Sequence, residues 1–539
     1  MQKPIKRIFI FINRYKKEGA LILYPFLVFL LYSIFSINNT KQFIKENISV
    51  AISCAIIFSL FQLIKNNKKT ALTLLYLFFA LGIFIKISFY ILYGTKFSSS
   101  AVFIIFETNL LEAYDFLEFY MNSKLILLLI SLLLPLVVLP FFKWENTVYR
   151  NSRILKLFFI SVIISSGILI FKKFKTEHIL SIAMHSYQDY RIVKKQMAFD
   201  FSENISPNIQ NIKRSAELNQ EEIHIVVIGE STTTWHMQLY GYHKETNPLL
   251  TEIRDELFIF DSVISPHTHT ILSLEKMLSY SNYENQKPER NASIVQLANQ
   301  AGFTSYWISN QRPIGFHESV ATNIARAAHK KYFVTSDEYG TQEVMDEAIL
   351  PVLDQVLKEP AQKKVVFIQL IGTHSPYYKR YPTEFAKFDN DIDDLLFPSK
   401  NAQKIRNQYD NAVLYNDFIV RSFIEKLRNT NTYSSLVYFS DHGEDVFDTM
   451  DFVGHNEYHA TRPMYEIPFL IWLSEHSKNN LFIPSEFLKR RYNAEDFIHS
   501  FADLLSIDFD EKESTRSLIN LDYKKRIRWI KENIDYDNQ

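Results

Sequence analysis

Long apolar runs separated by short polar segments dominate the first third of the chain. Each run approaches the length of about 20 mainly apolar residues that a helix needs to cross a bilayer. One such run could be a buried helix of a soluble protein, but five in succession predict a transmembrane domain. The predicted spans are residues 20–37, 48–64, 71–93, 125–142 and 154–171.

Lysine and arginine residues are unevenly distributed among the segments that flank these spans. Most of them lie in residues 1–19, 65–70 and 143–153, whereas residues 38–47 and 94–123 carry fewer. Cytoplasmic loops of membrane proteins have an excess of Lys and Arg, so we expect the N-terminus in the cytoplasm. With five spans, the chain after the last of them then lies on the opposite side of the membrane.

The second outward-facing loop, residues 94–123, contains the sequence FETNLLEAYDFLEFY. Thr108 and Glu112 are four residues apart in it and would share one face of a helix. The segment fits a solvated amphipathic helix on the membrane surface, and it also fits a polar site beside the lipid headgroups. Both hypotheses stay open on the residues alone.

Beyond residue 220, short apolar runs of strand type alternate with helical patterns. Such alternation predicts an α/β domain with a mostly parallel sheet flanked by helices. We therefore expect a transmembrane domain at residues 1–175, juxtamembrane helices and a linker at 176–220, and a globular domain at 221–539. The predicted strands are 223–228, 304–308, 364–370, 434–439 and 469–472, and the predicted helices include 291–301, 343–357 and 404–428.

Polar side chains follow three of the predicted strands directly. Glu230 comes after the first strand, His374 after the third, and Asp441 and His442 after the fourth. Because ligands of open α/β sheets gather outside the carboxyl ends of the strands, we expect these side chains to converge at one edge. Two carboxylates and an imidazole suit zinc, with manganese as the alternative. An isolated Asp-His pair is usually a turn, but the matching position of Glu230 favours a metal site.

Hydroxyl groups in two segments are candidates for a nucleophile. Residues 231–234 form a cluster of one serine and three threonines directly after Glu230, where a nucleophile on a strand-to-helix turn would stand. Thr268 and Thr270 precede a short amphipathic helix, where a threonine is most often only an N-cap. Such a threonine becomes a nucleophile if a metal ion deprotonates it and the helix N-terminus stabilises the phosphate that it attacks.

Composition and charge narrow the functional classes. The formal net charge of the 539 residues is zero, which gives no indication of nucleic-acid binding. The single cysteine, Cys54, lies inside an apolar run. Disulfides, cysteine-based zinc sites and a thiol nucleophile are therefore excluded for the globular part.

Several short motifs follow one another in an order that resembles the bacterial phosphoethanolamine transferases, which belong to the alkaline phosphatase/sulfatase-like superfamily. Each motif is weak alone, but the ordered set is specific, and the resemblance spans nearly the whole chain. It implies an enzyme of the bacterial inner membrane with five transmembrane helices and a periplasmic catalytic domain. The motifs are GES at 229–231, LYGYHKETNPLL at 239–250, the threonine segment at 265–279, WISNQ at 307–311, GTHSPYYKRYP at 372–382, SDHGE at 440–444 and GHNE at 454–457.

The resemblance also implies roles for individual residues. It implies a site for one zinc ion or two, with manganese as the alternative, and a nucleophile at Thr270. Thr270 rather than Thr268 matches the family's reactive threonine, because Ser273 follows three positions later. His374 and His455 match histidines near the transferred group and are expected to be catalytic. The implied zinc ligands are Glu230, Thr270, Asp441 and His442, and the implied substrate contacts are Thr108, Glu112 and Asn310.

The implied reaction transfers phosphoethanolamine in two steps. Thr270 attacks the phosphorus of phosphatidylethanolamine, and a hydroxyl of lipopolysaccharide or lipooligosaccharide, on a core heptose or on lipid A, then displaces the threonine. We expect a monomer that binds membrane lipids and no nucleic acid. Two alternatives remain, a glycerophosphate transferase of the lipoteichoic-acid synthase type and a non-catalytic membrane protein that has kept the fold. A sulfatase is disfavoured because the Cys- or Ser-x-Pro-x-Arg signature is missing.

Overall fold

The chain folds into two compact units. The helical unit comprises Met1–Phe106 and Tyr120–Tyr190, and the sheet unit comprises Glu107–Phe119 and Arg191–Gln539. The computed structural model describes residues 2–64, 66–98, 101–102, 105, 110–138, 153–188, 191, 203–215, 220–284, 291–311, 320–335, 344–389, 395–531 and 533–538.

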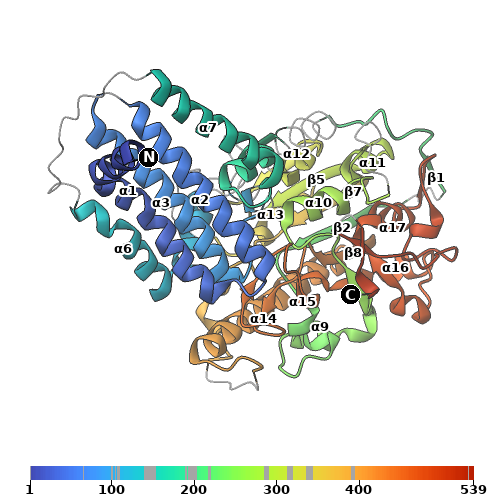
Figure 1. Cartoon of the computed structure of the whole chain (residues 1–539). Helices are drawn as coiled ribbons and strands as arrows, with labels where there is room; N and C mark the ends of the chain where they lie inside the picture. Colours follow the sequence, from blue (N-terminus) through green and yellow to red (C-terminus); the bar gives the residue numbers. More distant parts are fainter. Residues whose placement is uncertain are drawn as a thin grey trace. The chain divides into compact units, whose positions relative to one another are not determined.

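The helical unit contains the apolar runs of the first third of the chain (Figure 1). Among the described residues, four helices are long and apolar enough to cross a membrane, and the number rises to five if the bent pair Ala113–Tyr120 and Ser123–Val137 counts as one span. The prediction of a domain with several transmembrane helices is confirmed. The long helices are α1 (Gln2–Ser36), α2 (Thr40–Leu63), α3 (Lys68–Tyr93), α6 (Ser123–Val138) and α7 (Arg153–Lys173).

Four of these helices share one apolar core. Phe29 of α1, Phe61 of α2 and Leu128 of α6 are buried in it together with side chains of α3. Lys86 of α3 also forms a buried ion pair with Glu46 of α2. A buried charge that loses its partner is strongly unfavourable, so this pair holds α2 and α3 in one register.

A seven-stranded sheet forms the centre of the sheet unit, in the order β3-β11-β8-β2-β7-β5-β6. Neighbouring strands are parallel except at β11, which is antiparallel to both β8 and β3. The prediction of a mostly parallel sheet is confirmed. The strands are β2 (Glu222–Gly229), β3 (Leu257–Ile259), β5 (Thr304–Ser309), β6 (Lys330–Phe333), β7 (Lys363–Gln369), β8 (Tyr433–Ser440) and β11 (Phe469–Leu473).

The two edge strands, β3 and β6, do not follow from the hydrophobic pattern. β3 has three residues, and β6 is exposed or half-buried along its whole length. Such short, partly exposed strands give too few positions for an alternation to be recognised. Short strand pairs outside the sheet are β1 (Lys213–Arg214) with β13 (Ile507–Asp508), β9 (Asp445–Val446) with β10 (Val453–Gly454), β4 (Ser262–Ile264) with β12 (Arg491–Asn493), and β14 (Trp529–Ile530) with β15 (Ile534–Asp535).

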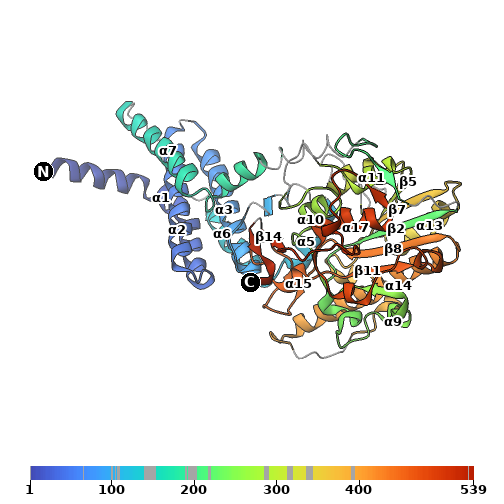
Figure 2. The ribbon, with the colours of Figure 1, turned by 90° about the vertical axis from the view of Figure 1, so that its right-hand side faces the viewer.

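Helices cover both faces of the sheet (Figure 2). In β2, Val226 and Ile228 belong to the apolar cluster of α11 and α17, whereas Ile225 and Val227 belong to that of α13 and α14. β2 is buried on both faces, which explains its uninterrupted apolar sequence. The helices of the sheet unit include α9 (Pro248–Glu252), α10 (Thr270–Met277), α11 (Ile294–Gln300), α12 (Val320–Arg326), α13 (Ile349–Leu357), α14 (Lys400–Arg428), α15 (Arg462–Tyr465), α16 (Glu475–Lys478) and α17 (Phe497–Leu504).

The N-terminus of α11 shows how a cap sets a helix boundary. The hydrophobic pattern predicts a helix from residue 291, but α11 begins at Ile294. Ser293 Oγ accepts a hydrogen bond from the Gln296 backbone N–H at 3.2 Å, and the Gln296 side chain accepts one from the Ser293 N–H at 2.9 Å. This reciprocal pair satisfies two backbone donors and fixes the first turn.

Candidate metal centre and nucleophile

The ends of β2, β7 and β8 bring the predicted metal-binding side chains together. β2 lies between the other two strands, so Glu230 comes between the segment with Asp441 and His442 and the segment with His374. Ser231 follows Glu230 with a φ of +56°, and its N–H donates to Asp441 Oδ1 at 3.1 Å. Left-handed backbone is unfavourable for serine and is often found at functional sites.

Gly372 lets the end of β7 approach Glu230 closely. Its φ is +54°, and a Cβ atom at this position would lie 2.8 Å from the Glu230 carbonyl oxygen. The same carbonyl accepts a hydrogen bond from the Thr373 N–H at 3.0 Å. A side chain at residue 372 would therefore separate the segment with His374 from Glu230.

The geometry around His442 tests whether Glu230, Asp441 and His442 fit a metal ion. Its Nδ1 lies 2.8 Å from the Gly443 carbonyl oxygen, so Nδ1 donates a proton there and a neutral ring keeps a lone pair on Nε2. This lone pair faces oxygens of Glu230 and Asp441 at 3.3 and 3.5 Å. Among the described residues, neither His442 Nε2 nor Asp441 Oδ2 has a hydrogen-bond partner. Three ligand atoms within 4.8 Å of one another therefore fit a cation, and zinc suits this set.

The charges of this cluster shift its pKa values in different directions. Burial, followed by the charge of Glu230, raises the pKa of Asp441 to about 8. Burial alone would lower the pKa of His442, but the carboxyl groups of Asp441 and Glu230 raise it to about 10. Burial alone would raise the pKa of Glu230, but His442 lowers it below its usual range. With protons on Asp441 and His442, the metal-free cluster carries no net charge. A divalent cation would displace these protons.

Thr270, the first residue of α10, turns its hydroxyl toward this cluster. Its Oγ1 donates to Glu230, with a distance of 3.3 Å to each carboxylate oxygen. Thr268 instead donates to Glu457 at 3.1 Å. Of the hydroxyls after Glu230, that of Ser231 also donates to the Glu230 carboxylate, at 3.0 Å, whereas Thr232 donates to the Glu230 carbonyl at 3.2 Å and Thr233 to the Glu466 carbonyl at 3.3 Å. Of the two candidate threonines, Thr270 is the one whose hydroxyl reaches the metal centre.

His374 and His455 also lie near the cluster. Nδ1 of His374 is 2.7 Å from the Ser375 carbonyl oxygen, and Nδ1 of His455 is 2.8 Å from Glu444 Oε2. Nδ1 is the donor in both rings, so each neutral ring keeps a lone pair on Nε2. Burial lowers the pKa of His374. The His455 and His442 ring centroids are 4.2 Å apart, and His442, Glu444 and His455 form a second group with metal-ligand spacing.

Gln311 is a site residue that the sequence analysis did not single out. Its Nε2 donates to Glu230 Oε2 at 3.1 Å. Its neighbour Asn310, the expected substrate contact, is buried, and its amide donates to the Val344 carbonyl at 2.8 Å and to Asp346 at 2.9 Å. Gln311 belongs to the WISNQ motif, and this motif was the sequence feature from which its place in the site could have been predicted.

The predicted helix in the loop 94–123 forms as α5 (Leu110–Tyr120), and residues 107–119 belong to the sheet unit. Asp115 binds Lys379 at 2.8 Å and Arg380 at 3.2 Å, and Arg380 Nε donates to the His374 carbonyl at 2.7 Å. This helix therefore supports the segment that carries His374. Thr108 and the side chain of Glu112 lie outside the described residues.

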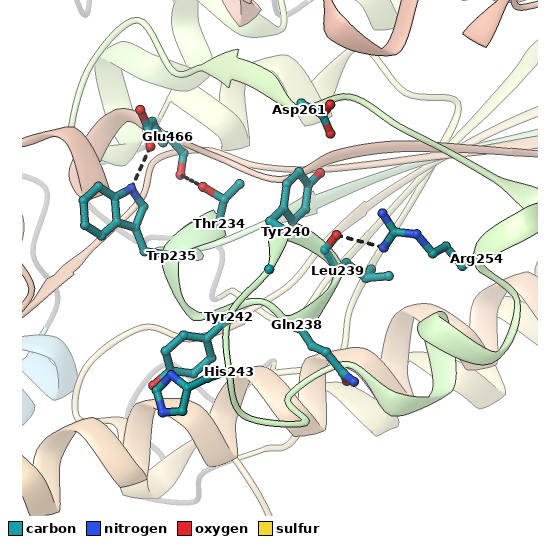
Figure 3. Close-up of a pocket in the computed structure, with 11 residues that line it drawn as sticks. Thr234, Trp235, Gln238, Leu239, Tyr240, Tyr242, His243, Arg254, Asp261 and Glu466 are labelled. Carbon is teal, nitrogen blue, oxygen red and sulfur yellow. Dashed lines mark hydrogen bonds between the residues drawn. The ribbon is translucent and has the colours of Figure 1, made fainter. Parts of the chain in front are cut away.

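A separate pocket of about 750 Å³ lies beside the loop that follows β2 (Figure 3). Within it, Trp235 Nε1 donates to Glu466 Oε2 at 2.6 Å, and Arg254 donates to the Leu239 carbonyl at 2.9 Å. No ligand of the metal centre lines this pocket, so it is a different site. Its lining residues are Thr234, Trp235, Gln238, Leu239, Tyr240, Gly241, Tyr242, His243, Arg254, Asp261 and Glu466.

The class of protein follows from the fold and the family match. Residues 223–507 match the Sulfatase family. The sheet unit is accordingly an alkaline phosphatase/sulfatase-like domain. It has a mostly parallel sheet, and a cluster of carboxylates, histidine and a hydroxyl lies at the C-terminal ends of its strands.

Three comparisons define the family more narrowly. The phosphoethanolamine transferase EptC of Escherichia coli (strain RS218) is 33% identical over 487 residues, which cover 83% of each chain. The zinc complex of the C-terminal periplasmic domain of EptC from Escherichia coli is 35% identical, with a TM-score of 0.59, and covers 61% of this chain and 96% of that domain. The lipooligosaccharide phosphoethanolamine transferase EptA of Neisseria meningitidis, an integral membrane protein, shares the fold at 20% identity, with a TM-score of 0.71 over 93% of this chain and 97% of that one. The chain belongs to the phosphoethanolamine transferases and is a membrane enzyme.

Proposed function

We propose that the enzyme transfers phosphoethanolamine from phosphatidylethanolamine to lipopolysaccharide or lipooligosaccharide, on a core heptose or on lipid A. The intermediate is a phosphoethanolamine ester of Thr270, formed at a zinc site. The observation that carries this proposal is the contact between Thr270 Oγ1 and both oxygens of Glu230, at 3.3 Å, beside the unpartnered atoms of Asp441 and His442. The zinc complex of the related EptC domain supports the choice of ion.

Glu230, Thr270, Asp441 and His442 would hold the zinc ion. When bound, zinc lowers the pKa of a ligating hydroxyl and offsets negative charge on the phosphate. Glu230 accepts the hydrogen bond of Thr270 and fixes its hydroxyl. Gln311 in turn donates to Glu230 and orients the carboxylate, as outer partners of metal ligands do.

In the first step, Thr270 Oγ1 forms a bond to phosphorus, and the bond from phosphorus to the glycerol oxygen breaks. The proton that leaves Thr270 is balanced by one proton that the departing diacylglycerol takes up. In the second step, the acceptor oxygen forms a bond to phosphorus and the bond to Thr270 Oγ1 breaks. The acceptor hydroxyl loses one proton and Thr270 regains one, so the enzyme is unchanged after both steps.

His374 and His455 are the proposed proton carriers. Each keeps a lone pair on Nε2, because Nδ1 donates to Ser375 or to Glu444. An Nε2 atom can take the proton of the acceptor hydroxyl and give a proton to the departing glycerol oxygen. Glu444 also accepts a hydrogen bond from Tyr377 at 2.6 Å, which fixes the carboxylate that orients His455.

The membrane helices keep the enzyme where both lipid substrates reside. We place the enzyme in the bacterial inner membrane, with its N-terminus in the cytoplasm and its sheet unit in the periplasm. We propose that it is a monomer. Thr108 and Glu112 remain proposed substrate contacts. Asn310 is proposed to act on the substrate through its neighbours, because its own amide is buried and donates to the Val344 carbonyl.

Mass spectrometry of lipopolysaccharide tests the transfer and identifies the acceptor. Cells with and without the gene are compared, and lipid A and core oligosaccharide are separated before measurement. A phosphoethanolamine increment that depends on the gene is expected on one of the two fractions. An unchanged mass spectrum for both fractions would contradict the proposal.

Thr270→Ala tests the covalent intermediate. Removal of the nucleophile should lower transfer by at least about 10³-fold, because only the two-step route uses this oxygen. Thr270→Ser keeps a hydroxyl and is the matched control, for which we expect measurable transfer. Both variants should keep the thermal unfolding midpoint of the parent. Retained activity in Thr270→Ala would move the nucleophile elsewhere, first to Thr268.

A further inference from the structure

A second set of side chains with metal-ligand spacing includes two histidines of the nucleophile segment. His267, His269 and Glu457 place three ligand atoms within 4.8 Å of one another. None of the three belongs to the metal centre described above. His267 and His269 precede α10, and Glu457 follows the β9-β10 hairpin.

His269 is the unexplained residue of this set. Its side chain is 4% exposed, and neither ring nitrogen has a hydrogen-bond partner among the described residues. It occupies the N-cap position of α10 but makes no capping hydrogen bond. A buried polar side chain without partners is unfavourable, so a ligand at this ring would explain its burial.

The hydrogen bonds of His267 determine which nitrogen keeps the lone pair. The Tyr283 hydroxyl donates its only proton to the Pro266 carbonyl at 2.9 Å. The same hydroxyl oxygen, 3.0 Å from His267 Nε2, must therefore accept a proton from that nitrogen. The lone pair of the neutral ring is then on Nδ1, which lies 3.2 Å from Glu457 Oε1. Two acceptor atoms face each other, and a cation between them resolves the repulsion.

Glu457 is held with one oxygen turned toward the histidines. Its Oε2 accepts the Thr268 N–H at 2.8 Å and the Thr268 hydroxyl at 3.1 Å. Oε1 remains for His267 and an ion. A proton on His267 would satisfy this contact but would leave both nitrogens of His269 without partners. A metal ion satisfies all three side chains at once.

We propose that His267, His269 and Glu457 form a second zinc site, separate from the catalytic ion and additional to the transfer reaction. Two imidazoles and one carboxylate are a known zinc ligand set, with a fourth position for water. Ligand atoms of a tetrahedral zinc ion lie about 3.3 Å apart, and His267 Nδ1 and Glu457 Oε1 already lie 3.2 Å apart. The Glu457 side chain is 15% exposed and provides the path by which the ion enters.

This zinc ion would cross-link two segments that the mechanism uses. One carries Thr270, and the other carries His455, two residues before Glu457. The sheet unit contains no cysteine, so no disulfide can make this connection. The ion would thus fix the segment with Thr270 to the segment with His455 without touching the reacting atoms.

Zinc counting on the purified full-length protein in detergent tests the site. The protein is stripped with a chelator, dialysed against zinc, and measured by inductively coupled plasma mass spectrometry. His269→Ala and the isosteric Glu457→Gln should each bind one zinc ion fewer per chain than the wild type. His476→Ala removes an exposed histidine of α16 that has no carboxylate partner among the described residues, and it should bind as much zinc as the wild type. Equal zinc content in all four proteins would overturn the proposal.

A second comparison separates this site from the catalytic centre. Glu230→Gln weakens the catalytic site, and in this background zinc should still raise the thermal unfolding midpoint. The same addition should have no such effect on Glu230→Gln combined with Glu457→Gln, if that double variant folds as judged by circular dichroism. An equal zinc-dependent shift in both proteins would overturn the second site even if the transfer mechanism is correct. Loss of transfer in Glu230→Gln has no bearing on this outcome.

Discussion

Two buried clusters of the sheet unit contain the same elements, a fully buried histidine between two carboxyl groups. In the metal centre, His442 lies between Glu230 and Asp441. In the second cluster, called the His236 cluster, His236 lies between Asp410 of α14 and Asp448. Composition and burial do not distinguish them, and the difference lies in what each ring nitrogen contacts.

The His236 cluster satisfies its own charges. His236 Nδ1 is 2.6 Å from Asp410, and Nε2 is 3.2 Å from Asp448. Lys244 binds Asp410 at 2.8 Å, and Arg406 binds Asp448 at 2.9 Å. Every ring nitrogen and both carboxylates have charged partners within the protein, so the cluster has no ligand position left.

The metal centre leaves two of its atoms, His442 Nε2 and Asp441 Oδ2, without a hydrogen-bond partner among the described residues. His442 directs Nδ1–H to the Gly443 carbonyl, so its second nitrogen faces the carboxyl groups without a hydrogen bond. No lysine or arginine forms an ion pair with Glu230 or Asp441 among the residues that the structure describes. In these two clusters, the histidine that donates to a carbonyl keeps a second nitrogen for a ligand, whereas the histidine with a carboxylate on each nitrogen forms a structural ion pair.

Glu230→Gln should give the largest effect that this comparison predicts. Loss of a ligand charge should remove the catalytic ion and lower transfer by about 10³-fold or more, measured as turnover of a fluorescent phosphatidylethanolamine. The metal-free variant should unfold near the temperature of the metal-free parent, because Asp441 can ionise and balance His442. Wild-type turnover in Glu230→Gln would show that the cluster is structural.

Asp410→Asn tests the other half of the comparison. This change leaves His236 and Lys244 without their shared carboxylate in a buried position. Breaking a buried ion pair destabilises by roughly 3–5 kcal/mol, so the thermal unfolding midpoint should fall by several degrees. Zinc content per folded molecule should stay at the parental value. An unchanged midpoint would contradict the structural role of the His236 cluster.

The sequence predicted the sheet and the convergence of the candidate metal ligands, because both depend on local pattern. Glu230, Asp441 and His442 stand directly after buried apolar strands, and parallel strands bring their carboxyl ends together. The His236 cluster could not be predicted, because Asp410 lies 174 residues from His236 and no local pattern connects them.

The direction of the side chains after a strand could not be predicted from the sequence either. Asn310 and Gln311 are adjacent in one motif, but only Gln311 reaches Glu230. Successive residues of an extended segment point to opposite sides, and the side that faces the site depends on the strand's neighbours. The motif therefore contains the contact with Glu230, but the residue that the resemblance singled out is its neighbour Asn310.

The pH dependence of stability gives the smallest predicted effect. Burial alone would lower the pKa of His236, but Asp448 and Asp410 raise it to about 9, above its unfolded value of about 6.5. The protonated ring therefore stabilises the fold fully below pH 6.5, and this contribution is lost as the pH rises through 9. We expect it to amount to about 1–3 kcal/mol. His236→Gln removes the titrating group, so the unfolding midpoint of the parent should fall more steeply between pH 6.5 and 9.5 than that of the variant. Because both proteins share all other titrating groups, parallel curves would show that His236 is not charged in the folded state.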